Sequence, residues 1–127
     1  MFPLLVINTY YYKMQYRYEN ITINSIYDGD TLTVTLHIGF KIDFTTRLRL
    51  YGINTWEVRG KEREKGIIAR DWLRARLEGK QVAIQTIKDK KGKYGRYLAI
   101  IFVKDGDKWT DVNQELLGKG HGVSFMV

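Results

Sequence analysis

Residues 31–38 read Thr-Leu-Thr-Val-Thr-Leu-His-Ile, in which polar and apolar side chains alternate without a break. A period of two is typical of a strand that buries one face. The alternation resumes in residues 42–50, after a turn at Gly39, with Arg47 and Arg49 on the opposite face. The two runs predict a hairpin, and the predicted buried face of its second strand consists of Ile42, Phe44, Thr46, Leu48 and Leu50.

The segments around this hairpin predict three more strands and two helices. Residues 16–27 are rich in Ile, Tyr and Thr and predict a strand that enters the hairpin through an Asp-Gly-Asp turn. Residues 62–77 change to a helical period, carried by Ile68, Trp72, Leu73 and Leu77, and residues 80–87, 96–103 and 112–118 predict two strands and a final helix. This order predicts an α+β, mainly β fold: a five-stranded OB-type barrel with a helix after strand 3 and a short C-terminal helix.

Length and composition predict one basic domain. The chain has 127 residues, with 21 Lys and Arg against 14 Asp and Glu and a formal net charge of +7. Such an excess suits a polyanionic partner such as nucleic acid, although it is also compatible with a merely soluble basic protein. Because the chain has no cysteine, thiol chemistry and thiolate metal sites are excluded, and a bound metal would need oxygen or imidazole ligands.

The N-terminal segment predicts neither a membrane span nor a secretory signal. Residues 1–7 are apolar, but the run is too short for a bilayer and has no basic residue before it. We therefore expect no membrane association and favour a cytoplasmic over a secreted location. We expect residues 1–15 to be an N-terminal extension and residues 16–127 to form the domain.

The turn Asp28-Gly29-Asp30 places two carboxylates two residues apart, where both can face one hard cation. Because Asp-Gly between strands is also a common hairpin signal, the turn alone leaves a structural role open. Downstream, Arg49 is followed at a glycine turn by an amide, a hydroxyl and a carboxylate, at Asn54, Thr55 and Glu57. Taken alone, Arg49 could be a solvated residue on a strand. Glu57, likewise, could be an ordinary acidic residue that precedes a helix.

Lys93-Tyr94-Gly95-Arg96 combines basic and aromatic side chains in one loop. A guanidinium offers paired hydrogen bonds to phosphate oxygens, and a tyrosine ring can stack on a base. This combination suits single-stranded nucleic acid.

Four segments in order resemble the staphylococcal nuclease (thermonuclease) family: residues 27–31, 47–57, 93–96 and 112–117. The resemblance spans about residues 16–124 and implies an OB barrel that cleaves phosphodiester bonds of DNA and RNA with Ca²⁺. It implies that Arg49 and Arg96 bind the phosphate and that Glu57 orients or deprotonates the attacking water. It further implies a metal site in which Asp30 and the backbone carbonyl of Thr55 bind the metal directly, Asp28 lies near the metal without binding it, and Asn54 occupies a second ligand position. Nucleotide contacts are implied at Lys93 and Tyr94.

Two residues depart from the family pattern. Asn54 supplies a neutral oxygen where the family has a carboxylate, which lowers the expected Ca²⁺ affinity and leaves Mg²⁺ or Mn²⁺ open. Trp56 replaces the usual proline before Glu57. We expect a monomeric endonuclease acting on single-stranded or unpaired DNA or RNA. The alternatives are a noncatalytic nucleic-acid-binding module and a protein-interaction barrel.

Overall fold

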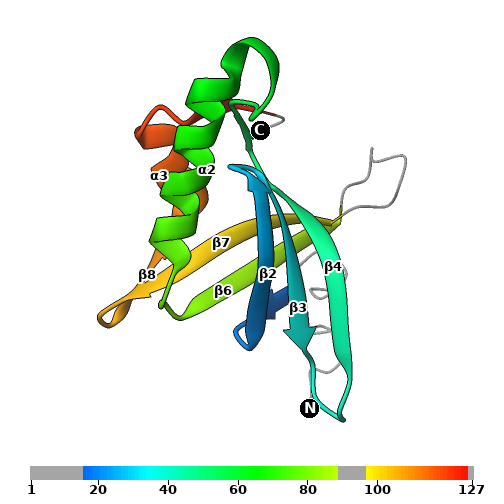
Figure 1. Cartoon of the computed structure of the whole chain (residues 1–127). Coiled ribbons are helices and arrows are strands. Elements are labelled where there is room, and N and C mark those ends of the chain that lie inside the picture. Colours follow the sequence, from blue (N-terminus) through cyan, green and yellow to red (C-terminus); the bar gives the residue numbers. More distant parts are fainter. Residues whose placement is uncertain (1–15, 89–96, 126–127) are drawn as a thin grey trace.

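A computed structural model describes residues 16–88 and 97–125, and this part of the chain is mainly β with two α-helices (Figure 1). The predicted mainly β, α+β character is confirmed. Residues 1–15, the predicted extension, lie outside the described residues. The strands are β1 (Tyr16–Tyr18), β2 (Ile21–Asp28), β3 (Thr31–His37), β4 (Asp43–Leu50), β5 (Ile53–Thr55), β6 (Val82–Lys88), β7 (Tyr97–Asp105), β8 (Lys108–Asp111) and β9 (Gly122–Ser124). The helical elements are the 3₁₀ turn η1 (Gly60–Glu62), α2 (Arg63–Leu77) and α3 (Val112–Gly118).

The larger sheet has the order β1-β6-β7-β4-β3-β2, and β8 pairs with β7. Only β4 and β7 run parallel among its described pairs. β1 and β2 form the two ends of this order although only two residues separate them, so the sheet curls strongly. The predicted strand count is corrected: the sheet is an open order of seven strands and not a clearly closed five-stranded barrel. The single strand predicted over residues 16–27 is broken at Glu19–Asn20, which adds one strand, and β8 adds another.

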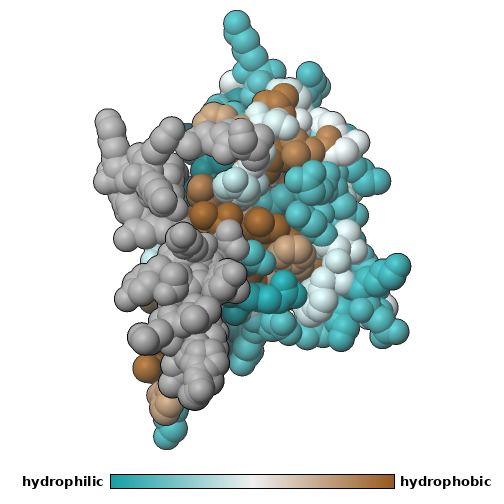
Figure 2. All heavy atoms as spheres, turned by 180° about the vertical axis from the view of Figure 1, so that it is seen from behind, coloured by the Kyte–Doolittle hydropathy of each residue, from teal (hydrophilic) through white to brown (hydrophobic). Residues whose placement is uncertain are grey.

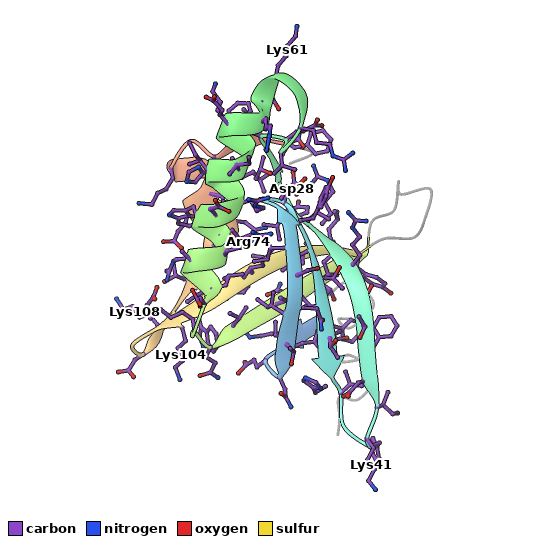
Figure 3. The ribbon with its side chains drawn as sticks, in the orientation of Figure 1. Asp28, Lys41, Lys61, Arg74, Lys104 and Lys108 are labelled. Atoms are coloured by element: carbon purple, nitrogen blue, oxygen red, sulfur yellow. The ribbon has the colours of Figure 1, made fainter. Side chains whose placement is uncertain are left out.

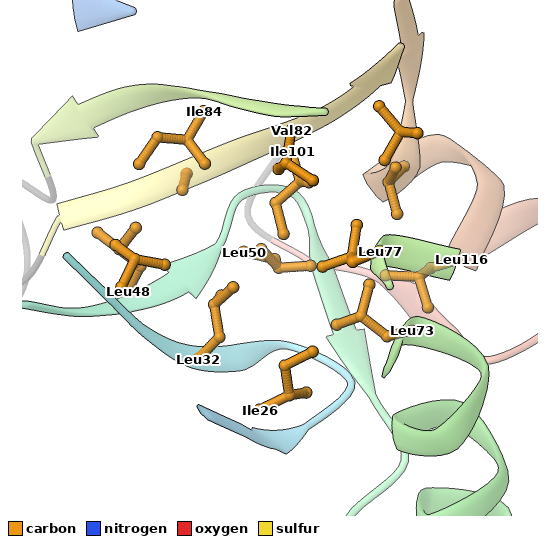
Figure 4. Close-up of a cluster of buried hydrophobic side chains, with 14 of the residues drawn as sticks. Ile26, Leu32, Leu48, Leu50, Leu73, Leu77, Val82, Ile84, Ile101 and Leu116 are labelled. Carbon is orange, nitrogen blue, oxygen red and sulfur yellow. The ribbon is translucent and has the colours of Figure 1, made fainter. Parts of the chain in front are cut away.

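The core lies between the curled sheet and the two helices (Figure 4). Leu32, Val34 and Leu36 of β3 are all buried, which confirms the alternation predicted for this strand. On α2 the buried positions are Gly66, Ala69, Leu73 and Leu77, spaced for one helical face. Ile68, predicted on that face, is 60% exposed because it points away from the sheet.

The hairpin of β3 and β4 extends beyond the core. Ile42 and Phe44 were predicted to be buried, but each is 52% exposed, and Phe40 at the turn is 97% exposed. Figure 2 shows apolar side chains at the lower end of the molecule, where this hairpin ends. The alternation therefore predicted the correct conformation over the whole strand but burial only at Leu48 and Leu50, because no layer of the described chain covers the outer half.

Asn113 at the start of α3 connects the helix to the sheet. It is 2% exposed, and its amide nitrogen donates to Tyr51 O (2.9 Å) and Ala99 O (3.0 Å). Its oxygen accepts from Ile101 N (3.1 Å). Since a buried amide is stable only when its polar atoms are paired, Asn113 fixes α3 against β7 and the turn after β4. The same turn leads into β5 and so determines where the polar site described below begins.

Candidate active site

Asp30 is the centre of a polar cluster at the β2–β3 turn. It is 6% exposed, and its Oδ2 accepts from the backbone N–H of Thr55 (2.9 Å) and lies 3.6 Å from Arg49 Nη2. Its Oδ1 accepts from the Thr31 hydroxyl (3.0 Å). The carboxylate thus ties the turn to β4 and β5, and three residues predicted from the sequence, Asp30, Arg49 and Thr55, come together in the structure.

Asp28 lies at the end of β2, and its Oδ1 accepts from the backbone N–H of Asp30 (3.1 Å). Burial, followed by hydrogen bonding and charge repulsion from Asp30, raises the pKa of Asp28 to about 6. Burial and mutual repulsion therefore disfavour the doubly charged form of this carboxylate pair, and a nearby cation would reduce that penalty. Clusters that perturb a pKa in this way are typical of functional sites.

Gly29 allows the turn to press against Thr55. A Cβ at Gly29 would lie 2.9 Å from Thr55 Cγ2, closer than side chains normally approach. Thr55 is 4% exposed, and its Oγ1 has no hydrogen-bond partner within the described residues. Buried hydroxyls are normally paired, so this oxygen is an exception within the polar cluster.

Arg49 is fixed by three oxygen acceptors. Nη1 donates to Leu50 O and Ile53 O, both at 3.0 Å, and Nη2 donates to Asn54 Oδ1 at 2.9 Å. The Phe125 ring lies 5.2 Å from its guanidinium carbon. Because the side chain is only 17% exposed and held from several sides, the guanidinium keeps one orientation next to Asp30. Asn54 is brought to the cluster, but its side-chain oxygen faces Arg49.

Glu57 follows β5 in an exposed loop, adjacent to the cluster in sequence. Its backbone N–H donates to Glu62 Oε1 (3.2 Å), and α2 packs on its carbonyl at Gly66. A Cβ at Gly66 would lie 2.0 Å from Glu57 O. Sequence reasoning missed Gly66, although a glycine inside a predicted helix is a signal of close packing.

Gly66→Ala should lower the free energy of unfolding by about 1–3 kcal/mol, because the new methyl group would collide with Glu57 O. The sign of this change in the free energy of unfolding is informative, since alanine in a helix is ordinarily favoured over glycine by about 1 kcal/mol. Urea unfolding of both proteins measures the difference. The control is Gly118→Ala in α3, where a Cβ meets nothing within 4 Å and no loss is expected. Equal stability of Gly66→Ala and the unmodified protein would contradict the packing described here.

The C-terminal segment pairs with β5 through the strand β9. β9 pairs with β5, with Asn54 opposite Val123, and the Phe125 backbone N–H donates to Gly52 O (3.0 Å). Trp56, the departure from the family pattern, donates its indole N–H to Gly120 O (2.9 Å) and its backbone N–H to His121 O (3.2 Å). The loop before Glu57 is therefore held by hydrogen bonds at the tryptophan. Neither β9 nor these contacts were predicted.

Three predicted site residues, Lys93, Tyr94 and Arg96, lie outside the described residues. Among residues 16–88 and 97–125, no group of three or more His, Cys, Asp or Glu side chains is arranged to hold a metal ion. The acidic part of the cluster is thus the pair Asp28 and Asp30. In the same part of the chain, no helix has the length and apolar character needed to cross a membrane.

A strongly curled sheet with a fixed guanidinium beside the Asp30 carboxylate defines a small OB-like domain with a polar site at one strand turn. Residues 47–126 match the family model described as Staphylococcal nuclease homologue. This match covers more than half of the chain, and the chain therefore belongs to that family. It includes Arg49 and Glu57 but begins after the Asp28–Asp30 turn.

An uncharacterised protein of Methanocaldococcus jannaschii is similar to this chain. The two are 26% identical over an alignment of 144 positions, and the alignment covers 87% of this chain and 67% of the archaeal protein. Membership of the family supports a nuclease-type, nucleic-acid-binding domain.

Proposed function

We propose that this protein is a metal-dependent endonuclease that hydrolyses phosphodiester bonds in DNA or RNA. The observation that carries the proposal is Arg49, held by three acceptors next to the Asp30 carboxylate in a member of a nuclease family. A guanidinium fixed in advance stabilises negative charge on phosphate oxygens without reorganising during the reaction. Hydrolysis of a phosphodiester builds such charge on the nonbridging oxygens.

Ca²⁺ is the metal that we propose, with Mg²⁺ or Mn²⁺ as alternatives. Asp28 and Asp30 offer carboxylates, and Thr55 offers its backbone carbonyl, all oxygen donors of the kind that hard cations bind. The raised pKa of Asp28 fits a site that is more favourable with a cation nearby. A bound cation would supply positive charge next to the phosphate. We assign Asn54 to holding Arg49, because its oxygen accepts the Nη2 hydrogen bond.

The remaining roles follow the family resemblance. Glu57 orients the attacking water or accepts its proton. The water oxygen forms a new bond to phosphorus, the P–O bond to the leaving sugar oxygen breaks, and this oxygen takes up a proton to leave as a hydroxyl. Arg96 provides the second guanidinium, and Lys93 and Tyr94 contact the nucleotide. We propose a monomer that acts on single-stranded or unpaired substrate.

Metal removal tests the reaction. The protein is incubated with single-stranded DNA and RNA in Ca²⁺, Mg²⁺, Mn²⁺ or excess chelator, and the products are separated by length. We expect internal cuts with at least one cation and none with chelator, with activity restored when the metal is added back. Cutting that continues in chelator would contradict the metal assignment. The absence of cutting under every condition would contradict the proposed nuclease activity.

A noncatalytic binding module is the second candidate. It is favoured by the neutral Asn54 and by the presence of only two clustered acids in the described part of the chain. Its signature in the same experiment is salt-sensitive binding of the oligonucleotides without any cutting.

A further inference from the structure

An arginine-lined groove lies between β2 and the side of α2 that faces this strand, next to the proposed active site. It encloses about 390 Å³, and four arginines, Arg59, Arg63, Arg70 and Arg74, line it together with Tyr27. Ile26 and Ile67 contribute apolar side chains, and no acidic residue belongs to its lining. The groove therefore combines concentrated positive charge with apolar surface.

The arginines form a row along one helix face. Arg70 and Arg74 are separated by four residues, and Arg63 precedes Arg70 by seven, spacings that keep side chains on the same face. At 1.5 Å per residue, the row extends over about 16 Å of α2. Figure 3 shows Arg74 on the side of α2 that faces β2, where its Nη2 donates to Ile26 O (2.8 Å).

Two of the four arginines have no carboxylate partner in the part of the chain that the structure describes. Asp71 lies near Arg70 (3.0 Å) and Arg74 (3.8 Å), but it is itself exposed and outside the groove lining. Within residues 16–88 and 97–125, neither Arg59 nor Arg63 forms an ion pair. Arginines that converge without neutralising carboxylates form an attractive site for phosphate groups.

Tyr27 connects the groove to the active site. Its ring is 42% exposed, and the guanidinium carbons of Arg47 and Arg59 lie 5.5 Å and 5.8 Å from its centroid. Tyr27 immediately precedes Asp28, and Arg59 follows Glu57 by two residues. Tyr27 lines the groove and is followed directly in β2 by Asp28, so one end of the groove lies beside the proposed active site.

We propose that this groove binds the backbone of a single-stranded polynucleotide several nucleotides away from the bond that is cut. Arg59 and Arg63 contact phosphates, while the Tyr27 ring and the apolar wall contact sugars or bases. The inference rests on the proposed function for the identity of the ligand. Since the groove lies outside the cluster around Asp30, its contribution is to the affinity for long substrates and not to the chemical step.

The test measures binding separately from cutting. Fluorescence anisotropy in excess chelator gives the affinity of the protein for single-stranded DNA of 4 and 16 nucleotides at several salt concentrations. The test variant is Arg59→Gln/Arg63→Gln, which removes two unpaired charges. The control, Lys41→Gln/Lys108→Gln, removes the same charge at the tips of two other hairpins, away from Asp28 and Arg74 (Figure 3).

We expect the test variant to bind the 16-nucleotide strand about tenfold more weakly, with a log–log salt slope reduced by about 1.4 for two lost phosphate contacts. The control should bind it as the unmodified protein does, and neither variant should alter affinity for the 4-nucleotide strand. The proposal would be overturned if the test variant lost equal affinity for both strand lengths, if both variants lost equal affinity, or if no affinity was lost. The proposed function is judged independently, because the unmodified protein and the test variant are also assayed for metal-dependent cutting of short strands.

Discussion

Arg49→Ala is expected to reduce phosphodiester cleavage by about 10² to 10³-fold at saturating metal, the usual consequence of losing one preorganised charge-stabilising donor. In this structure the guanidinium is oriented by Leu50 O, Ile53 O and Asn54 Oδ1 before any substrate binds. A mobile side-chain cation would have to be ordered during the reaction, whereas the Arg49 guanidinium is already in place. Single-turnover rates on a short single-stranded substrate measure the effect, and we expect a similar loss for Arg96→Ala.

Arg49→Lys separates charge from geometry. Lysine keeps the positive charge but has no planar fork to reach the same carbonyls, so we expect it to recover little of the lost rate. Both variants leave buried acceptors unpaired, at a cost of about 1–3 kcal/mol in the free energy of unfolding. Urea titrations therefore accompany the kinetics. A folded Arg49→Ala protein that retained most of its cleavage rate would remove Arg49 from the reaction.

Local patterns predicted most of the architecture. The alternation over residues 31–38 corresponds to β3, and the predicted final helix has the observed bounds Val112–Gly118. These elements are long enough, and regular enough in hydrophobic period, for the pattern to show in the sequence. The pattern could not predict that Phe44 is half exposed, because burial depends on which layer covers a strand and not on the strand's own period.

The polar site was predicted only in part, because some of its contacts join residues that are far apart in the sequence. Asp28, Asp30 and Arg49 could be selected because phosphate and metal chemistry limits the residue types that can serve. Their actual partners include Phe125, which comes from the distant C-terminal segment and lies over Arg49. Short strands such as β9 have no period of their own, so their pairing with β5 exists only in the folded chain.

Asn54 illustrates the same limit. From the sequence, an amide at the position of a carboxylate ligand predicts weaker metal binding. In the structure its Oδ1 accepts from Arg49 Nη2, a contact that only the turn between β4 and β5 creates. As a neutral acceptor, Asn54 orients Arg49 without placing a second negative charge beside the guanidinium in addition to that of Asp30.

Glu57→Gln should lower the cleavage rate by about 10² to 10⁴-fold, the range expected when a residue that handles the proton of the attacking water is removed. The substitution keeps the size of the side chain and leaves the backbone bond from Glu57 N to Glu62 unchanged. Glu57 is exposed, so we expect no loss of stability. Single-turnover rates and oligonucleotide affinity, measured on the same preparation, separate chemistry from binding.

Glu62→Gln is the matched control, since it removes a nearby carboxylate but retains the oxygen that accepts from Glu57 N. We expect it to cut normally, whereas Glu57→Gln should bind substrate at least as well as the unmodified protein because a negative charge near the phosphate is gone. If Glu57→Gln and Glu62→Gln were impaired equally, the loop as a whole, and not the carboxylate of Glu57, would be what the reaction requires.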